Sequence, residues 1–450
     1  MSRLRLSLTW PLLLAFAFYP LWWLLGIGSF TWIIFVAPML VGMITRRWTK
    51  APPVVFIWML FLSWVLMSGF QLHGGTRILT FTYRFLLYAG STVFFLYVYN
   101  LPRTGRYSAR VLRILTVFWI LVVAFGYLGI LLKSFTYTPP FAHLIPGSLR
   151  NRPFTQELVM PVFAEVQHFL GFPVPRPSAP FAYTNQWGAV MAVLTPVALA
   201  AIISAGPGRR RKLLIVVLAA QIVPMVFSLN RGMFLCVGLG LIYLAIRLAI
   251  RGSGRALAAI VGVAVAGVLL VVATPLGSLV SGSFSSTHGN SNSSRLEVYA
   301  QSVSGVSQSP IFGYGAPQVQ AGTTGAPAIG TQGQLWMVLY SNGYPAIVLF
   351  VLFFLSVAWQ TRKARGTAGL CLHAVPLVGL AEIAFYGWLP AEIQLIMAVC
   401  ALAYRQTWTV QADRSAMLPP AEAGVTALPV RPDVLVGYAE PAEGLRAAQL

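Results

Sequence analysis

The feature that most constrains this chain is a series of long apolar segments that recurs from the N-terminus to about residue 405. A helix needs about 20 mostly apolar residues to cross the hydrocarbon core of a bilayer, and it satisfies its backbone hydrogen bonds internally. The alternating apolar and polar strands typical of a membrane barrel are absent from the sequence. About twelve segments meet the requirement for a spanning helix, with boundaries good to a few residues. They are 8–27, 29–45, 54–71, 78–99, 111–132, 182–204, 213–229, 232–250, 256–277, 335–359, 367–387 and 390–405.

Composition agrees with a membrane protein. Hydrophobic residues make up 57% of the chain and charged residues 9%, with a mean hydropathy of +0.75, whereas a soluble domain has about 25% charged residues. We therefore expect an all-α, polytopic membrane helix bundle over residues 1–410. The Ala-, Pro- and Glu-containing stretch 411–450 is expected to be a disordered cytoplasmic tail.

The distribution of basic residues predicts the orientation. Lys and Arg concentrate in alternate loops, which the positive-inside rule assigns to the cytoplasm together with both termini. These residues are Arg3, Arg5, Arg46, Arg47, Lys50, Arg103, Arg106, Arg110, Arg113, Arg209, Arg210, Arg211, Lys212, Arg247, Arg251, Arg255, Arg362, Lys363, Arg365 and Arg405. The net charge of +21 is thereby explained without nucleic acid as a partner, and the chain is expected to be a multi-pass protein of the plasma (inner) membrane.

Two long loops are expected on the outer face, at about 133–181 and 278–334. Within the first, PVFAEVQHFLGF (161–172) is predicted as a short interfacial helix. Within the second, SSRLEVYAQSVSGV (293–306) has helical character and SPIFGYGAP (309–317) is rich in turn residues. The second loop is therefore expected to be partly helical.

Several charges lie near the outer face, against the positive-inside trend. Arg231, in FSLNRGMF (227–234), is expected at the outer junction of two spans, Arg84 about one to two turns inside a span, and Arg295 in the large loop. An ionisable group at a helix centre costs about 2.5–3.5 kcal/mol on insertion scales. Glu382 lies near the outer end of its span, where it could pair with Arg84 or Arg231.

These arginines can be interpreted in two ways. Arg231 alone could extend its side chain to the lipid head groups, and Arg295 alone could be a solvated loop residue. Together they favour a site for a lipid-linked phosphate or pyrophosphate, because the guanidinium fork matches phosphate oxygens. Gly232 beside Arg231 allows close approach of the backbone to a ligand.

Other chemistries have little support in the sequence. Cys236, Cys371 and Cys400 lie in apolar segments without metal-ligand spacing, and no nucleotide-binding or hydrolase motif is present. We therefore expect no metal and no cofactor. Glu165 and His168 form an acid–His pair that would share a face of the predicted short helix, or a solvated pair. Glu392 is expected at the membrane interface.

Four segments in order show a family resemblance. RPSAPFAYTNQWG (176–188), FSLNRGMF (227–234), SSRLEVYAQSVSGVSQSPIFGYG (293–315) and GQLWMVLYSNGYPAIVLFVLFFL (333–355) together resemble the O-antigen ligase / O-antigen polymerase superfamily of bacterial envelope enzymes. The resemblance covers about 176–355. It implies a metal-independent glycosyltransferase that takes a glycan from a polyprenyl diphosphate at the outer face and passes it to a glycan or lipid acceptor.

The resemblance also implies roles for individual residues. Arg231 matches the arginine of the family's Ser-Arg-Gly motif, with Ser228 shortly before it and Gly232 after it. Arg295 matches the loop arginine, and both would bind the diphosphate and stabilise the leaving group. Asn185 matches an asparagine at the start of a helix.

One position departs from the family pattern. Where ligases have a histidine, this chain has Gln332, which can orient a hydroxyl but cannot accept a proton at neutral pH. The alternative bases are Glu165, His168, His288 and Glu382, unless proton transfer is late and needs no base. Trp336 is expected to stack on a sugar or to belong to the interfacial aromatic belt.

Two other functions remain open at this level. A polysaccharide flippase or exporter would place cations along a path through the membrane. A non-catalytic subunit of an envelope polysaccharide assembly complex would not need the missing histidine.

Overall fold

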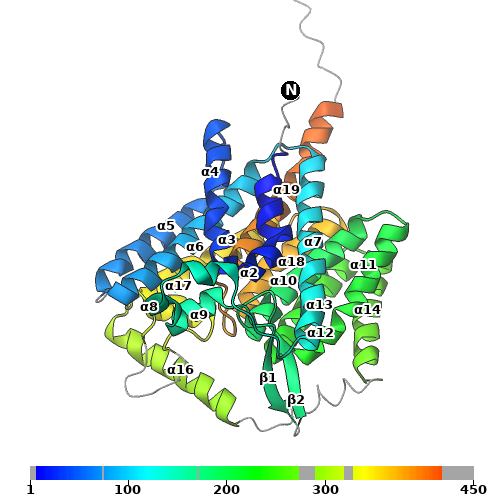
Figure 1. Ribbon diagram of the computed structural model, residues 1–450. Coiled ribbons are helices and arrows are strands. Elements are labelled where there is room, and N and C mark those ends of the chain that lie inside the picture. The colour runs from blue at the N-terminus through cyan, green and yellow to red at the C-terminus, as the bar shows by residue number, and fades with distance from the viewer. Residues whose placement is uncertain (1–6, 73–74, 170–171, 273–288, 319–327, 418–450) are drawn as a thin grey trace, which may run out of the picture. The chain divides into compact units, whose positions relative to one another are not determined.

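The computed structural model describes residues 7–72, 75–169, 172–272, 289–318 and 328–417 (Figure 1). The chain divides into two units, Met1–Thr409 and Val410–Leu450. Only the end of the last helix is described in the second unit, so the predicted tail lies outside the described residues from 418 onward. The first unit is almost entirely helical.

The elements follow one another from the N-terminus in this order. They are α1 (Trp10–Leu12), the π-helix η1 (Leu13–Ala17), α2 (Tyr19–Leu24), α3 (Gly28–Ile34), α4 (Val36–Thr45), α5 (Val54–Ser68), the 3-10 helix η2 (Gly69–Gln71), α6 (Gly75–Asn100), α7 (Gly105–Leu131), the 3-10 helix η3 (Pro140–Leu144), α8 (Gly147–Arg150), α9 (Pro153–Val159), β1 (Ala164–Phe169), β2 (Phe172–Pro177), α10 (Thr184–Ser204), α11 (Arg209–Ala220), α12 (Ile222–Phe227), α13 (Arg231–Ile250), α14 (Gly254–Val272), α16 (Gly289–Gln308), α17 (Gln334–Thr361), α18 (Gly366–Glu382) and α19 (Glu392–Met417).

Seven helical stretches in the described part of the chain are long and apolar enough to cross a membrane, which agrees with the predicted multi-pass class. They are Gly28–Thr45, Val54–Gln71, Arg77–Asn100, Gly105–Leu131, Thr184–Ser204, Arg231–Ile250 and Gln334–Thr361. Of the other predicted segments, the ninth and the twelfth coincide with α14 and α19, the eleventh with the shorter helix α18, and the first and the seventh with interrupted helices. The first is divided among α1, η1 and α2, and the seventh between α11 and α12, where Pro20 and Pro224 each remove a backbone donor.

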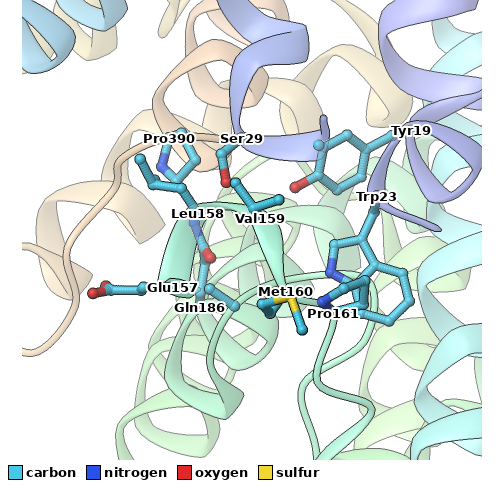
Figure 2. A pocket seen from close by; sticks show the side chains of 12 residues that line it. Tyr19, Trp23, Ser29, Glu157, Leu158, Val159, Met160, Pro161, Gln186 and Pro390 are labelled. Carbon is cyan, nitrogen blue, oxygen red and sulfur yellow. The ribbon is translucent and has the colours of Figure 1, made fainter. Parts of the chain in front are cut away.

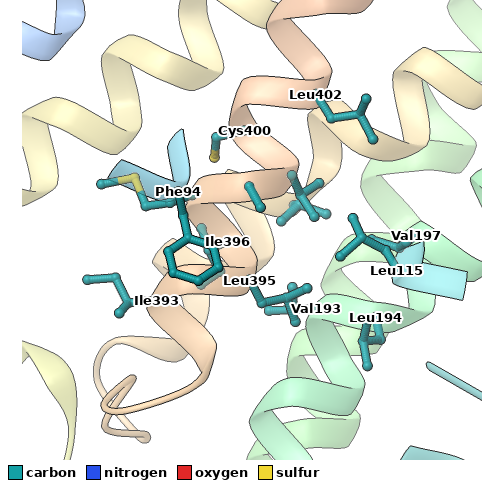
Figure 3. Packing of buried hydrophobic residues seen from close by; sticks show 14 of the residues in the cluster. Phe94, Leu115, Val193, Leu194, Val197, Ile393, Leu395, Ile396, Cys400 and Leu402 are labelled. Carbon is teal, nitrogen blue, oxygen red and sulfur yellow. The ribbon is translucent and has the colours of Figure 1, made fainter. Parts of the chain in front are cut away.

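The core lies around α10, whose span is 89% buried. Its sequence is apolar all round rather than on one face, as expected of a helix enclosed by other helices. Figure 3 shows Val193 of α10 beside Leu395 of α19, and Val197 beside Leu115 of α7. α10 also packs against α13 and α18.

One end of the bundle bears the structured loops, and we call it the loop end. α10, α13, α17 and α19 begin there, and α5 and α18 end there. The hairpin β1–β2 and α16 lie below the helix bundle in the view of Figure 1. The helix predicted at 293–306 falls within α16.

The predicted interfacial helix at 161–172 is wrong, because this segment enters an antiparallel hairpin of β1 and β2. The prolines Pro173, Pro175 and Pro177 explain the difference, since a helix cannot accommodate proline at alternate positions. In the hairpin, Glu165 is paired with Arg176. Positions three apart on a strand fall on opposite faces, so the shared helical face predicted for Glu165 and His168 does not exist.

α17 is interrupted one third of the way along. Gly343 has φ +79° and ψ −179°, which breaks the helical run. The carbonyls of Tyr340 and Ser341 instead accept hydrogen bonds from the backbone N–H groups of Tyr314 (3.1 Å) and Gly315 (2.7 Å). The turn-rich segment 309–317 is therefore docked into the break in α17.

Candidate functional site

The loop of residues 383–391, which joins α18 to α19, is the meeting point of several helices at the loop end. The backbone N–H of Gln334, at the start of α17, donates to the Tyr386 carbonyl (2.7 Å). The carbonyl of Ala384 accepts from the Trp336 indole (3.1 Å) and from the Tyr299 hydroxyl of α16 (3.2 Å). The 383–391 loop thus holds α16 and α17 together.

The start of α13 reaches the same loop. The Tyr386 hydroxyl donates to the Asn230 side-chain oxygen, directly before Arg231. A Cβ on Gly232 would overlap the Tyr386 hydroxyl, so glycine is required there for the close approach. Arg231 is half-buried at the first position of α13.

Arg295 lies on α16, one turn before Tyr299, and its side chain lies outside what the structure describes. Tyr299, on the same helix, donates to the Ala384 carbonyl of the 383–391 loop. The helices that bear Arg231 and Arg295 therefore converge on one loop.

The other residues predicted around Arg231 have mainly structural contacts. The Ser228 hydroxyl is buried and donates to the Met225 carbonyl (2.6 Å). Asn185 is half-buried in the first turn of α10. The Trp336 ring stacks on Tyr299 with a centroid distance of 4.6 Å, so one of its faces is occupied by protein.

Gln332 lies just before α17 and is half-buried. Its neighbour Gln334, to which we assigned no role from the sequence, is fully buried and fixed. The Gln334 amide donates to the Tyr88 hydroxyl (2.6 Å) and its carbonyl oxygen accepts from the Trp388 backbone N–H (3.0 Å). Gln332 is therefore the glutamine that remains available to a ligand near the loop.

Glu165 is occupied by protein groups. One carboxylate oxygen accepts from the backbone N–H of Thr184 at the start of α10 (3.0 Å), and the other lies 3.7 Å from Arg176. Arg176 also donates to the Ser228 carbonyl (2.8 Å). These contacts tie the hairpin to α10 and to the turn before α13. The His168 side chain and all of His288 lie outside the described residues.

Glu382 and Glu392 form a buried pair. Both are fully buried and interact electrostatically, and none of their four carboxyl oxygens has a hydrogen-bond partner in the described part of the chain. Among the described residues Glu382 forms no ion pair with Arg84 or Arg231, and the Glu392 side chain, predicted at the membrane interface, is buried within the protein. Two carboxylates this close in an apolar setting disfavour the charged form of each other.

Arg84 and Arg231 lie on different helices, α6 and α13. Arg84 faces a cavity between α5, α6 and α17 that is lined by Val65, Phe81, Arg84, Phe85, Tyr88, Gly315, Met337, Ser341 and Asn342. Hydrogen bonds run from Tyr88, in the wall of this cavity, through Gln334 and Tyr386 to Asn230 before α13. Arg231 is not among the residues that line the cavity.

A second cavity lies between α2, α3, α9 and the start of α10 (Figure 2). Figure 2 shows Trp23 and Met160 on one side of it and Glu157 on the other. Burial, and after it the negative charge of Glu157, raise the pKa of Tyr183 well above its usual value, so its hydroxyl stays protonated beside that carboxylate. Glu157 was not predicted as a site residue. The signal that could have identified it is the rarity of acidic residues in this chain, which makes each one in the predicted outer loops a candidate.

The described residues contain no group of three or more His, Cys, Asp or Glu side chains that could hold a metal ion. The chain matches no family model and no curated protein sequence. The loop end does combine the N-termini of α10, α13, α17 and α19 with Arg231, and helix N-termini and guanidinium groups both favour an anion.

Proposed function

We propose that this chain is a membrane glycosyltransferase of the O-antigen ligase/polymerase type. It would have about twelve spanning helices, with both termini in the cytoplasm and the loop end at the outer face of the plasma membrane. Its donor would be a glycan linked to a polyprenyl diphosphate, and its acceptor a second glycan or a lipid. The observation that carries this proposal is the convergence of α13, which begins with Arg231, and of α16, which bears Arg295, on the 383–391 loop.

The chemistry suits an arginine site without a metal. The bond between the anomeric carbon and the diphosphate oxygen breaks, and a bond from that carbon to an acceptor hydroxyl oxygen forms. Negative charge develops on the departing diphosphate, where Arg231 and Arg295 would stabilise it. The N-terminus of α13 adds a favourable dipole at the same place.

The acceptor hydroxyl must also lose a proton. Glu165 is engaged with Thr184 and Arg176, and Glu382 is buried against Glu392. Gln332 would orient the hydroxyl, and the proton would leave to water late in the reaction, when the oxygen has become acidic through bond formation.

Reconstituted protein tests this proposal. Vesicles containing the full chain and a polyprenyl-diphosphate oligosaccharide are assayed for release of free polyprenyl diphosphate and for a glycosylated acceptor. Removing one donor to a developing oxyanion typically lowers kcat by about 10²–10³, and we expect this loss for Arg231→Ala. Arg209→Ala removes the same charge at the exposed start of α11 and should retain activity.

The alternative functions predict different results. Movement of the intact donor across the vesicle membrane without release of diphosphate would indicate a flippase. No transfer by a folded wild-type protein with any acceptor tested would leave the non-catalytic subunit as the better account.

A further inference from the structure

Arg84 is a charged residue without a partner inside a membrane-spanning helix. It lies in α6, within the span Arg77–Asn100. Its Nη1 is buried and has no hydrogen-bond partner, and Arg84 forms no ion pair among the described residues. Glu157 of α9 acts on it electrostatically, as do the hydroxyl groups of Tyr83 and Tyr88, but none of them forms a bond with it. An uncompensated cation at this depth is costly, so the structure requires an acceptor that the described protein does not supply.

The cavity in front of Arg84 is lined by a second hydrogen-bond donor that has no acceptor among the described residues. The Ser341 hydroxyl is buried and has no partner, and it lines the same cavity. Asn342 is already engaged, because its amide donates to the Ser68 hydroxyl. The remaining walls include Phe81, Phe85 and Met337. Two unpartnered donors in an otherwise apolar cavity fit one small anionic group.

The cavity has a built cover. Gly315, with φ +73°, lines it from the docked segment 309–317. Arg77, two turns before Arg84, donates to the carbonyls of Tyr314 (2.5 Å) and Ala316 (3.1 Å) and so fixes this segment over α6. The donors are therefore held in position without a ligand, which lowers the cost of binding.

The surface beside the cavity indicates what bears the anionic group. Leu66 and Met67 follow the cavity residue Val65 in α5, Leu86 follows the cavity residue Phe85 in α6, and all three are exposed (56%, 44% and 43%). In a spanning helix such side chains face lipid. A ligand that joins a small anion to a long apolar chain satisfies both surfaces, whereas a soluble anion satisfies only the donors.

We propose that Arg84 and Ser341 bind the phosphate headgroup of an anionic lipid whose hydrocarbon chain lies along α5 and α6. No residue of the 383–391 loop lines this site, and the site does not depend on the proposed glycosyl transfer. The headgroup phosphate accepts hydrogen bonds from Arg84 Nη1 and the Ser341 hydroxyl, and its charge neutralises the guanidinium.

Thermal unfolding of the purified full chain in a neutral detergent tests this proposal. The probes are phosphatidylglycerol, phosphatidylcholine and inorganic phosphate. Phosphatidylglycerol should raise the melting temperature of the wild type in a concentration-dependent way. A hydrogen bond to a charged group contributes about 1.5–3 kcal/mol, so Arg84→Gln should weaken the apparent affinity about tenfold to hundredfold. Arg209→Gln, which removes an exposed charge at the start of α11, should leave it unchanged.

Ser341→Ala is the second variant. It deletes a hydroxyl that has no hydrogen-bond partner among the described residues. The fold should therefore persist, while the affinity for phosphatidylglycerol falls several-fold. An unchanged affinity would count against the site even if Arg84→Gln did not fold. The proposal is overturned if phosphatidylcholine stabilises the wild type as much as phosphatidylglycerol does. It is also overturned if phosphatidylglycerol stabilises the wild type and Arg84→Gln equally. An Arg84-dependent effect of inorganic phosphate as large as that of phosphatidylglycerol would overturn the assignment to a lipid.

Discussion

Replacing Gly343 by alanine should destabilise the docking of segment 309–317 into α17. A Cβ at this position would overlap the Ile311 carbonyl oxygen and lie 2.7 Å from the Pro310 carbonyl oxygen. The backbone angles, φ +79° and ψ −179°, belong to a region that only glycine adopts readily. The alanine variant must therefore move either α17 or the segment packed against it.

The expected loss follows from two contributions. Holding alanine in this backbone region costs about 1–3 kcal/mol. Separating the segment would also break the hydrogen bond from the Tyr344 N–H to the Pro310 carbonyl (2.9 Å), which contributes about 0.5–1.5 kcal/mol. Together these give a loss of about 2–4 kcal/mol in the free energy of unfolding.

The assay is thermal unfolding in detergent, combined with limited proteolysis of the 309–317 segment. Gly238→Ala is the matched control, because a Cβ there meets nothing within 4 Å in the middle of α13. The control should be neutral or stabilised by up to about 1 kcal/mol. The reasoning is refuted if the two variants melt alike and segment 309–317 is cleaved no faster in Gly343→Ala.

Two further substitutions have defined outcomes. Arg405→Met should lower the free energy of unfolding by about 2–5 kcal/mol. The reason is that the buried Arg405 donates to the carbonyls of Leu101 and Pro102 (2.6 Å each) at the turn between α6 and α7. Arg209→Met is the exposed control, and equal melting temperatures of the two variants would contradict the expectation. Glu392→Gln should leave the free energy of unfolding unchanged or raise it slightly. An amide can donate to the Glu382 carboxylate, and the substitution removes the repulsion between two like charges. A marked loss of stability would contradict this and would indicate that both carboxylates are charged and bind a cation.

The membrane class was readable from the sequence because it depends on the hydropathy of long segments. α10 is the clearest case, since Thr184–Ser204 is apolar on every side and the structure buries it at the centre. The interruption near Pro224 had a local signal too. The hairpin is harder to predict, because the apolar residues of 161–172 are compatible with a helix and only the prolines that follow, Pro173, Pro175 and Pro177, exclude one.

The arrangement around the 383–391 loop could not be predicted. The contact of Tyr386 with Asn230 joins residues far apart in the sequence, and the contact of Tyr299 with Ala384 does the same. Local pattern gives no information on such pairs. The sequence marks Arg84 as unusual by its depth in a span, but the cavity that Arg84 faces depends on how α17 packs, which only the structure describes.

The burial of Glu392 also depended on tertiary packing. Its position at the start of a span predicts a place at the membrane interface, and only the structure shows that its side chain is enclosed by protein near Glu382. A one-dimensional reading of hydropathy cannot distinguish these outcomes.

The account's central claim, that Arg231 and Arg295 act on one diphosphate, is tested most directly by a double-mutant cycle. The measurement is the rate of release of free polyprenyl diphosphate by wild type, Arg231→Ala, Arg295→Ala and the double variant in the same vesicles. Two side chains that stabilise the same leaving group should show strongly non-additive effects, with the double variant little slower than the slower single variant. Losses that multiply would contradict a shared site, and release that persists in the double variant would contradict the function itself.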